Sequence, residues 1–373
     1  MKAKDIALLC TAAGAAGIAA GAAAAAGEKS RTAKKPRKEA VHSPQRSAEK
    51  VISISSAPLM PEGNGLAFVA AAPCREGICA VYEAGGDSRA FVFSGSDYRE
   101  VRCPVGAYGI ARAGGSTAFI NARGAVFVPD DPEGEPVLCG INSPAYICAH
   151  GSDYYIFSDS LLYICTPDGG IAKIVSLYAM MDIPDGDVCD AENSDDSFSS
   201  FSVKIKKVCF FEGSPFAAVI TEDGRSFLMC SEEDSCSFEE AYPDVSDAAF
   251  FGSDAYYICR LSEGYGLIRT RVGDGCCETV GKFRLCGSDR TPVGIAPAVY
   301  GLAVNYSDGG VGFLFARAED EGCREFYRNA LANIGTELGG ITADEIFPSE
   351  NGLFVRCGKE LTAYTFSRLG EHR

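Results

Sequence analysis

The chain has 373 residues, of which 47% are hydrophobic and 23% are charged, a composition typical of a protein with a packed core. Its formal charge of −16 is unevenly divided: residues 1–50 hold ten Lys/Arg against four Asp/Glu (net +6), and the remainder holds 24 against 46 (net −22). So acidic a body disfavours nucleic-acid binding, because phosphates are recognised mainly through Lys and Arg.

Residues 1–27 form an Ala/Gly-rich hydrophobic segment. The stretch from Ile6 to Ala26 contains 21 residues without a charge, enough to cross a bilayer as a helix. An uncleaved membrane anchor, a cleaved signal peptide and a merely Ala-rich tail are the competing interpretations. More Lys/Arg follow the segment than precede it, so the positive-inside rule places its C-terminal side in the cytoplasm. Gly17 and Gly21 have the GxxxG spacing of a helix–helix or dimer contact within a membrane.

Residues 28–50 are polar, contain proline and lack hydrophobic periodicity. This composition predicts a disordered basic linker. Beside a membrane, its positive charge favours contact with anionic lipid headgroups, and the alternative is a solvated linker with no specific contact.

A strand–turn–strand unit recurs through the rest of the chain. The phrase HGSDYYI at 150–156 returns as FGSDAYY at 251–257, and seven such units are recognisable. Their Gly-Ser and Asn-Gly turns provide the positive φ that tight hairpins need, and their aromatic residues favour strands. The middle strand of each unit is predicted to begin near residues 78, 116, 153, 215, 254, 300 and 352.

A fourth, weaker strand follows most of these units. It reads REVRC at 99–103, EPVLC at 135–139, IAKIV at 171–175 and CCETV at 276–280. The last unit has no fourth strand of its own, whereas VISIS at 51–55 precedes the first unit and lacks a partner there. We therefore predict that residues 51–55 close the last unit from the other end of the chain.

The order and spacing of these units resemble the β-propeller superfold, whose four-stranded blades repeat about every 40–50 residues. The resemblance implies an all-β, seven-bladed propeller of four-stranded antiparallel blades over residues 51–373. Six blades and a tandem of β-sandwiches are the alternatives. No specific propeller family is indicated, since the chain has no Trp and therefore no Gly-His…Trp-Asp signature.

Two regions interrupt the repeat. Residues 177–204 form an acidic insert in which Asp185, Asp187 and Asp190 are candidate calcium ligands, although the spacing of an EF-hand loop is missing. The alternative for this insert is a solvated acidic loop. Residues 323–338 are predicted to form a short helix between the sixth and seventh units.

The sequence offers little catalytic chemistry. Of the three histidines only His150 lies within the repeats, where we expect a turn residue. The adjacent Cys276 and Cys277 are expected to present one buried and one exposed thiol. Seventeen cysteines without a CxxC pair indicate a reducing compartment more than a disulfide framework. We therefore predict no catalytic and no cofactor-binding residue, and calcium as the one candidate cofactor.

These observations predict a bacterial, membrane-tethered scaffold that binds a protein or another ligand without catalysing a reaction. Its acidic body favours a partner with a basic surface, and the propeller is expected in the cytoplasm. An exported propeller enzyme of the hydrolase or lactonase type and a cation-responsive sensor domain are the alternatives.

Overall fold

A computed structural model describes residues 50–369 except for 60, 62–64, 96, 181–202, 212, 233–234, 274–275, 287–289 and 315–323. The hydrophobic segment and most of the basic linker lie outside these residues. In the described part of the chain, no helix is long and apolar enough to cross a bilayer.

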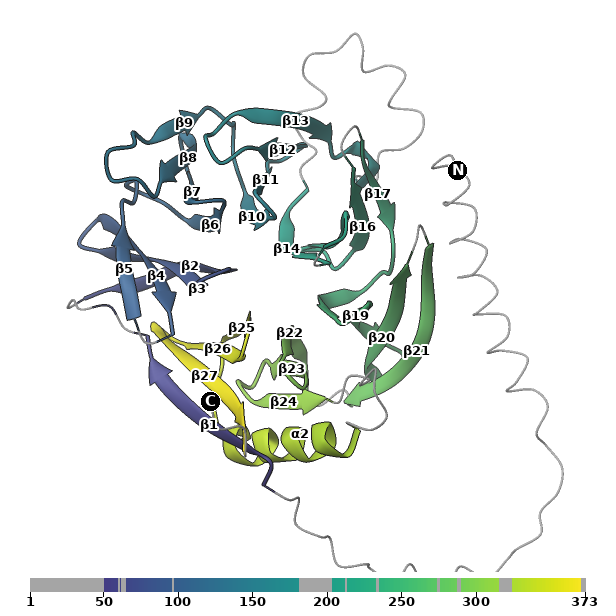
Figure 1. Ribbon diagram of the computed structural model, residues 1–373. Coiled ribbons are helices and arrows are strands. Elements are labelled where there is room, and N and C mark those ends of the chain that lie inside the picture. The colour runs from purple at the N-terminus through teal and green to yellow at the C-terminus, as the bar shows by residue number, and fades with distance from the viewer. Residues whose placement is uncertain are drawn as a thin grey trace, which may run out of the picture.

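Seven antiparallel sheets are arranged in a ring around a central axis (Figure 1). Each sheet is one blade, and in six of the blades the strands follow one another in chain order from the axis to the rim; in the seventh blade the outermost strand comes from the start of the described chain. The seven-bladed propeller predicted from the repeat is confirmed, and the two alternatives, six blades and a tandem of β-sandwiches, are wrong. Among the described residues, blade 6 has three strands and each of the other six blades has four.

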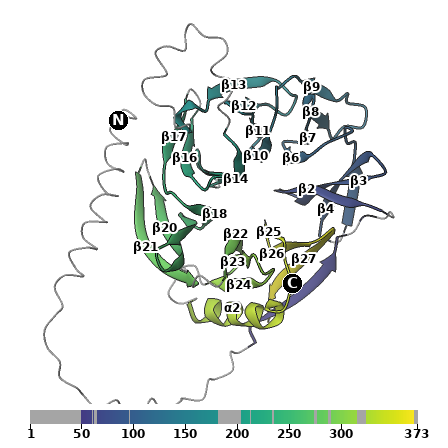
Figure 2. The ribbon, with the colours of Figure 1, turned by 180° about the vertical axis from the view of Figure 1, so that it is seen from behind.

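Blades 1 to 3 occupy residues 67–176, and the same ring is seen from behind in Figure 2. Their strands are β2 (Ala67–Cys74), β3 (Gly77–Ala84), β4 (Asp87–Ser94) and β5 (Asp97–Val101); β6 (Gly109–Ala113), β7 (Ser116–Asn121), β8 (Gly124–Pro129) and β9 (Val137–Cys139); and β10 (Tyr146–His150), β11 (Asp153–Phe157), β12 (Leu161–Cys165) and β13 (Ile171–Ser176).

A short 3-10 helix, η1 (Tyr178–Met180), follows β13, and blades 4 to 7 complete the ring. Their strands are β14 (Ile205–Phe210), β15 (Phe216–Thr221), β16 (Ser226–Ser231) and β17 (Cys236–Glu240); β18 (Val245–Phe251), β19 (Asp254–Leu261), β20 (Gly264–Gly273) and β21 (Cys276–Cys286); β22 (Pro292–Ala298), β23 (Gly301–Tyr306) and β24 (Val311–Leu314); and β25 (Glu345–Ser349), β26 (Gly352–Cys357) and β27 (Glu360–Arg368), with β1 (Ile52–Pro58) as the outer strand of blade 7.

The two ends of the described chain meet in blade 7. Strand β1 pairs antiparallel with β27, in a register that runs from Ile52 opposite Arg368 to Pro58 opposite Thr362. The prediction that residues 51–55 close the last unit is thereby confirmed. A closed ring leaves no open sheet between the first and last blades.

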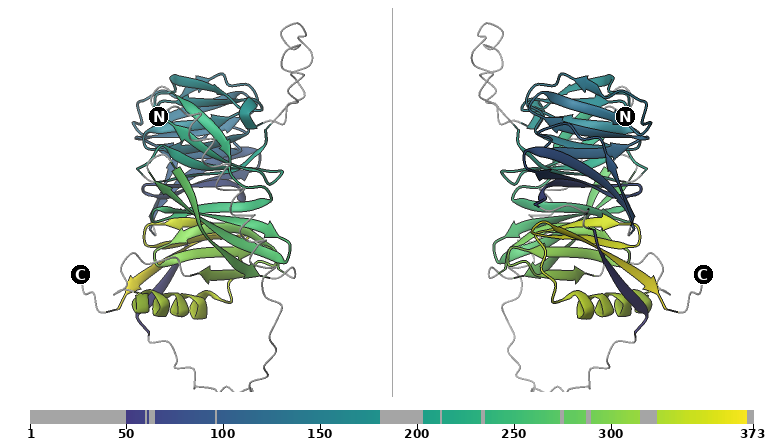
Figure 3. Two further views of the ribbon diagram at one scale, coloured as in Figure 1. Left: turned by 90° about the vertical axis from the view of Figure 1, so that its right-hand side faces the viewer. Right: turned by 90° about the vertical axis from the view of Figure 1, so that its left-hand side faces the viewer.

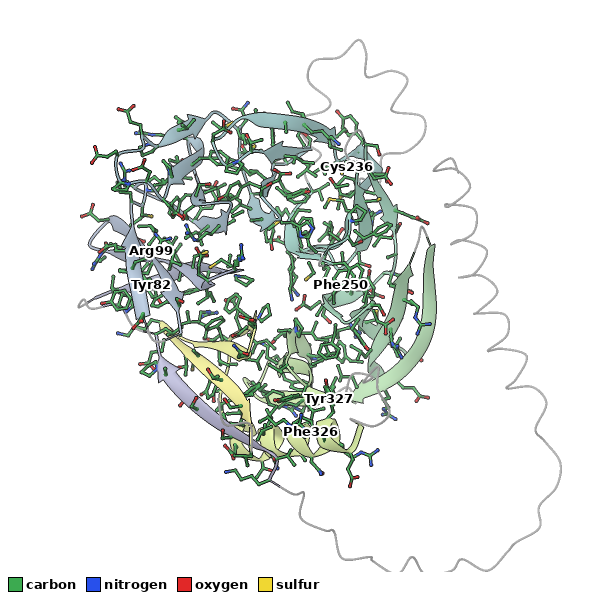
Figure 4. All side chains as sticks on the ribbon, in the orientation of Figure 1. Tyr82, Arg99, Cys236, Phe250, Phe326 and Tyr327 are labelled. Atoms are coloured by element: carbon green, nitrogen blue, oxygen red, sulfur yellow. The ribbon has the colours of Figure 1, made fainter. Side chains whose placement is uncertain are left out.

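Helix α2 (Arg324–Leu338) confirms the predicted helix between the sixth and seventh units. It packs against β24 and β1 on the outside of the ring (Figure 3). Its Ala330, Ile334 and Leu338 belong to the core shared by blades 6 and 7. Phe326 and Tyr327 of α2 both make edge-on ring contacts with Tyr300 (Figure 4).

The repeated Gly-Ser-Asp phrase forms the hairpin between the first two strands of blades 3 and 5. Gly151 and Gly252 have φ of 62° and 59°, a conformation that residues with a Cβ rarely adopt. The tyrosines after each turn are buried, and they face the two neighbouring blades alternately. Both faces of these strands are therefore covered.

Seven hydrophobic clusters, one between each pair of adjacent blades, make up the core. The cluster between blades 7 and 1 contains Phe354, Leu361, Ile78 and Phe91. Because each blade buries both of its faces, the ring is held together by packing around its whole circumference.

Candidate functional site

The innermost strands lie side by side in the same direction around the axis. We call the end at which they begin the leading end and the end at which they finish the trailing end. Most of their partly exposed side chains are small or apolar, as in Val69 to Ala72 of β2.

One charged group that was not predicted from the sequence crosses the innermost strands near the leading end. The Lys207 ammonium of β14 donates to Asp247 Oδ2 of β18 at 2.7 Å and to the Ile295 carbonyl of β22 at 2.9 Å. Asp247 Oδ2 also accepts the Ile295 N–H at 2.7 Å. Burial acts to lower the pKa of Lys207, but the Asp247 carboxylate outweighs it and the pKa is raised. The group therefore ties blades 4, 5 and 6 together.

A second charged group joins blades 1 and 2 at the trailing end. Arg112, whose side chain is 4% exposed, donates to both oxygens of Asp130 at 2.6 Å, to Glu76 Oε1 at 2.6 Å and to Thr117 Oγ1 at 2.9 Å. Hydrogen bonds from Arg112 lower the pKa values of Glu76 and Asp130. Because Arg112 holds both carboxylates, this group joins the two blades and stabilises the ring.

Aromatic rings cover the trailing end in blades 3 to 5. His150 is the last residue of β10, directly before the turn, and its ring stacks on Phe210 of β14 with the centroids 4.4 Å apart. Phe211 stacks on Phe250 of β18 with the ring centroids 5.4 Å apart. His150, expected from the sequence to be a turn residue, thus lies at the adjoining strand end, in contact with the next blade.

The outer rim between blades 2 and 3 exposes a set of apolar side chains. They are Val137 of β9 and Ile171 and Ile174 of β13, which are 43%, 45% and 56% exposed. We call these three residues the rim surface. A Cβ added to Gly169, in the turn before β13, would lie 3.1 Å from Val137, so the two blades are in contact here.

A β-bulge places the two isoleucines of the rim surface on one face of blade 3. The register passes from Ile164 opposite Lys173 to Cys165 opposite Ile171, so Ala172 is skipped. Ile174 pairs with Tyr163, and both Tyr163 and Cys165 pack toward blade 2. Ile171 and Ile174 therefore face blade 2, as Val137, paired with the core residue Phe127, faces blade 3.

Several predicted site residues lie outside the described residues. These are the calcium candidates Asp185, Asp187 and Asp190 and the membrane-contact candidates Gly17 and Gly21, all of which stay predictions. A rise in melting temperature on addition of calcium is the test of the first set. Strand β21 begins at Cys276, but the side chains of Cys276 and Cys277 are also outside the description. Within the described ranges, no three His, Cys, Asp or Glu side chains are grouped to hold a metal ion.

Six cysteines in the strands are free thiols. Cys79, Cys165 and Cys259 are buried, whereas Cys148, Cys209 and Cys230 are half-buried. Burial raises the pKa of the Cys209 thiol to about 11, which keeps it protonated at neutral pH. These cysteines act as small apolar residues of the strands.

Comparison with solved structures identifies the fold. YCF48 from Cyanidioschyzon merolae superimposes with a TM-score of 0.52 at 12% identity, covering 84% of this chain and 98% of that one. YCF48 bound to D1 peptide gives 0.52 at 10% identity, over 86% and 97%. The β-propeller domain of Cps50 (Swd1) from Myceliophteria thermophila gives 0.51 at 10% identity, over 82% and 97%. The sequence matches no protein-family model and no curated protein.

Proposed function

We propose that this chain is a non-catalytic β-propeller scaffold that binds a protein partner. The observation that carries the proposal is the rim surface, where three large apolar side chains from two adjacent blades are exposed on the outside of a closed ring. Exposed apolar groups of this kind mark interaction sites on soluble domains. YCF48, which shares the fold, has been captured with a bound peptide, and this supports protein binding as a use of the fold.

We further propose that residues 1–27 tether the propeller to a membrane and that the propeller lies in the cytoplasm. The uncharged stretch at 6–26 and the Lys/Arg-rich stretch that follows it support this orientation. The net charge of −22 over residues 51–373 favours a partner with a basic surface.

Protein binding is tested by cross-linking the tagged full chain in cells, purifying it and reconstituting each candidate partner with purified components. The tag alone is the control. We expect at least one partner to bind the purified chain in a fixed stoichiometry. A chain that reconstitutes with none of the cross-linked proteins would contradict the proposal.

The tether and its orientation are tested by treating intact and lysed cells with protease. We expect the propeller to sediment with membranes and to be degraded only after lysis. Degradation in intact cells would place it outside the cytoplasm, and recovery in the soluble fraction would exclude the anchor.

A further inference from the structure

The outer strands of the blades differ in how their free edges are protected. An edge strand presents unpaired N–H and C=O groups, and proteins protect such edges by charges, proline, short length or a covering helix. Charges protect three of these edges: β5 carries Asp97, Arg99 and Glu100, β17 carries Glu239 and Glu240, and β21 carries Lys282 and Arg284. Of the others, β9 is only three residues long, β1 ends in Pro58, and α2 packs against β24.

Strand β13 is the exception among these outer strands. Its six residues, Ile171–Ser176, include one charge, Lys173. That ammonium is turned toward blade 4, where it donates to the carbonyls of Glu232 at 2.8 Å and Ser235 at 3.3 Å. The edge of β13 is thus left with exposed isoleucines and without a charge of its own pointing outward.

An added strand would meet side-chain contacts as well as backbone groups. Strand addition to a sheet edge uses main-chain hydrogen bonds for affinity and alternate side chains for specificity. Side chains on one face of the added strand would cover Ile171, Ile174 and the neighbouring Val137 of blade 2. The bulge in β13 brings both isoleucines to this face, so a single alternating sequence can contact them together.

The charges around β13 indicate the kind of strand. Glu135 and Asp168 on the blade 2 side and Glu232 on the blade 4 side are exposed. They add to the acidic field of the whole body. A second copy of this chain would bring the same charges against each other, whereas a strand with Lys or Arg would be attracted.

We propose that β13 accepts an extended segment of a partner protein as a fifth strand of blade 3, with apolar side chains alternating with Lys, Arg or neutral polar ones. The proposal rests on the proposed protein-binding function and names its site and the chemistry of the partner.

The probe is a fluorescent nine-residue peptide in which valine alternates with lysine or threonine, titrated into the purified full chain. Two further peptides test the two parts of the proposal: one with glutamate in place of lysine, and one with N-methylated backbone amides. We expect the lysine peptide to bind, the glutamate peptide to bind about tenfold more weakly and the methylated peptide not to bind. Equal binding of all three would overturn the proposal, as would no binding of the first.

The site is tested with the double variant I171K/I174K. Its matched control is L261K/L369K, which places the same two charges on apolar residues that are 39% and 46% exposed elsewhere on the ring. We expect the peptide affinity to fall about tenfold in the first variant and to stay within about twofold of wild type in the control. Unchanged melting temperatures will show that both variants fold. Equal affinities for the two variants would place the peptide elsewhere.

Three outcomes separate this proposal from others. A wild-type dimer that I171K/I174K dissociates in sedimentation would make a second copy the occupant of β13 and overturn the partner proposal. If a reconstituted cellular partner binds I171K/I174K as well as wild type, protein binding stands and the strand-addition site is wrong. If no cellular partner is found although the peptide binds as expected, the general function fails while the edge chemistry stands.

Discussion

At the scale of single residues, Arg112 is the side chain whose loss should disturb the ring most. Its five N–H groups serve Asp130, Glu76 and Thr117, and nearly all of its surface is covered. Replacing Arg112 by leucine leaves two carboxylates facing each other without their cation. Arg99, which lies 3.3 Å from Asp130 but is 47% exposed, makes an ion pair with the same acid on the surface.

We therefore expect Arg112→Leu to lower the free energy of unfolding by about 3 kcal/mol. The control Arg99→Leu should cost less than about 0.5 kcal/mol, because exposed ion pairs contribute little. Urea titration followed by circular dichroism measures both. Equal losses in the two variants would show that burial of the Arg112 guanidinium is not what matters.

The same group predicts a pH dependence. Arg112 lowers the pKa values of Glu76 and Asp130 in the folded state, so the folded protein holds their charges more strongly than the unfolded chain does. Their contribution to stability is present above the unfolded pKa values of about 4 and is lost as the pH falls through the folded ones. In the double variant E76Q/D130N, the melting temperature should fall less between pH 6 and pH 3 than in wild type. Parallel curves would contradict the assignment.

Whether a side-chain contact can be predicted from the sequence depends on how the two residues are spaced along the chain. Lys207 and Asp247 are 40 residues apart, one blade period, and their contact could have been found by aligning equivalent positions of successive units. The rim surface could not have been found in this way. Strict alternation places Ile171 and Ile174 on opposite faces, and the bulge at Ala172 that reverses this depends on pairing with β12.

At the scale of the strands, the turn residues allowed the start of each middle strand to be predicted from the sequence. The middle strands begin at residues 77, 116, 153, 216, 254, 301 and 352, within one residue of the positions predicted. Each prediction relied on glycine, asparagine or aspartate at a hairpin turn. The backbone conformation of such a turn is favoured by the turn residues themselves, so it can be recognised from a short stretch of sequence. Strand β17, with two glutamates and a serine in five residues, gave no such signal and was not predicted.

Strand β1 should contribute measurably to the stability of the closed ring. Ile52 is fully buried in the cluster that blades 6 and 7 share with α2. Truncating it leaves a cavity worth about 3 kcal/mol, so Ile52→Ala should lower the melting temperature by about 5 °C. Ser55→Ala, at an exposed position of the same strand, should change it by less than about 1 °C. Equal shifts in calorimetry would mean that β1 closes the ring through backbone pairing alone.

At the scale of the whole molecule, charge should control how fast a basic partner arrives. A body of net charge −22 attracts cations over a distance that shortens from about 20 Å to about 8 Å as ionic strength rises from dilute buffer to physiological salt. The association rate of the lysine peptide should therefore fall about tenfold over this range, with a smaller change in its dissociation rate. Stopped-flow fluorescence measures the association and dissociation rates. An association rate that does not change with salt concentration would contradict electrostatic attraction.

The pairing of β1 with β27 also sets an order in time. Ile52 is synthesised 316 residues before its partner Arg368, so at about 5–20 residues per second the first strand waits about 15–60 s before its partner exists. Throughout that interval β1 must stay soluble without a neighbour. Its sequence, ISISSAP, suits this delay, because three serines and a proline limit premature pairing with other strands. Ring closure therefore waits until β27 has been made, and among the described strands the one that completes the ring is the earliest to be synthesised.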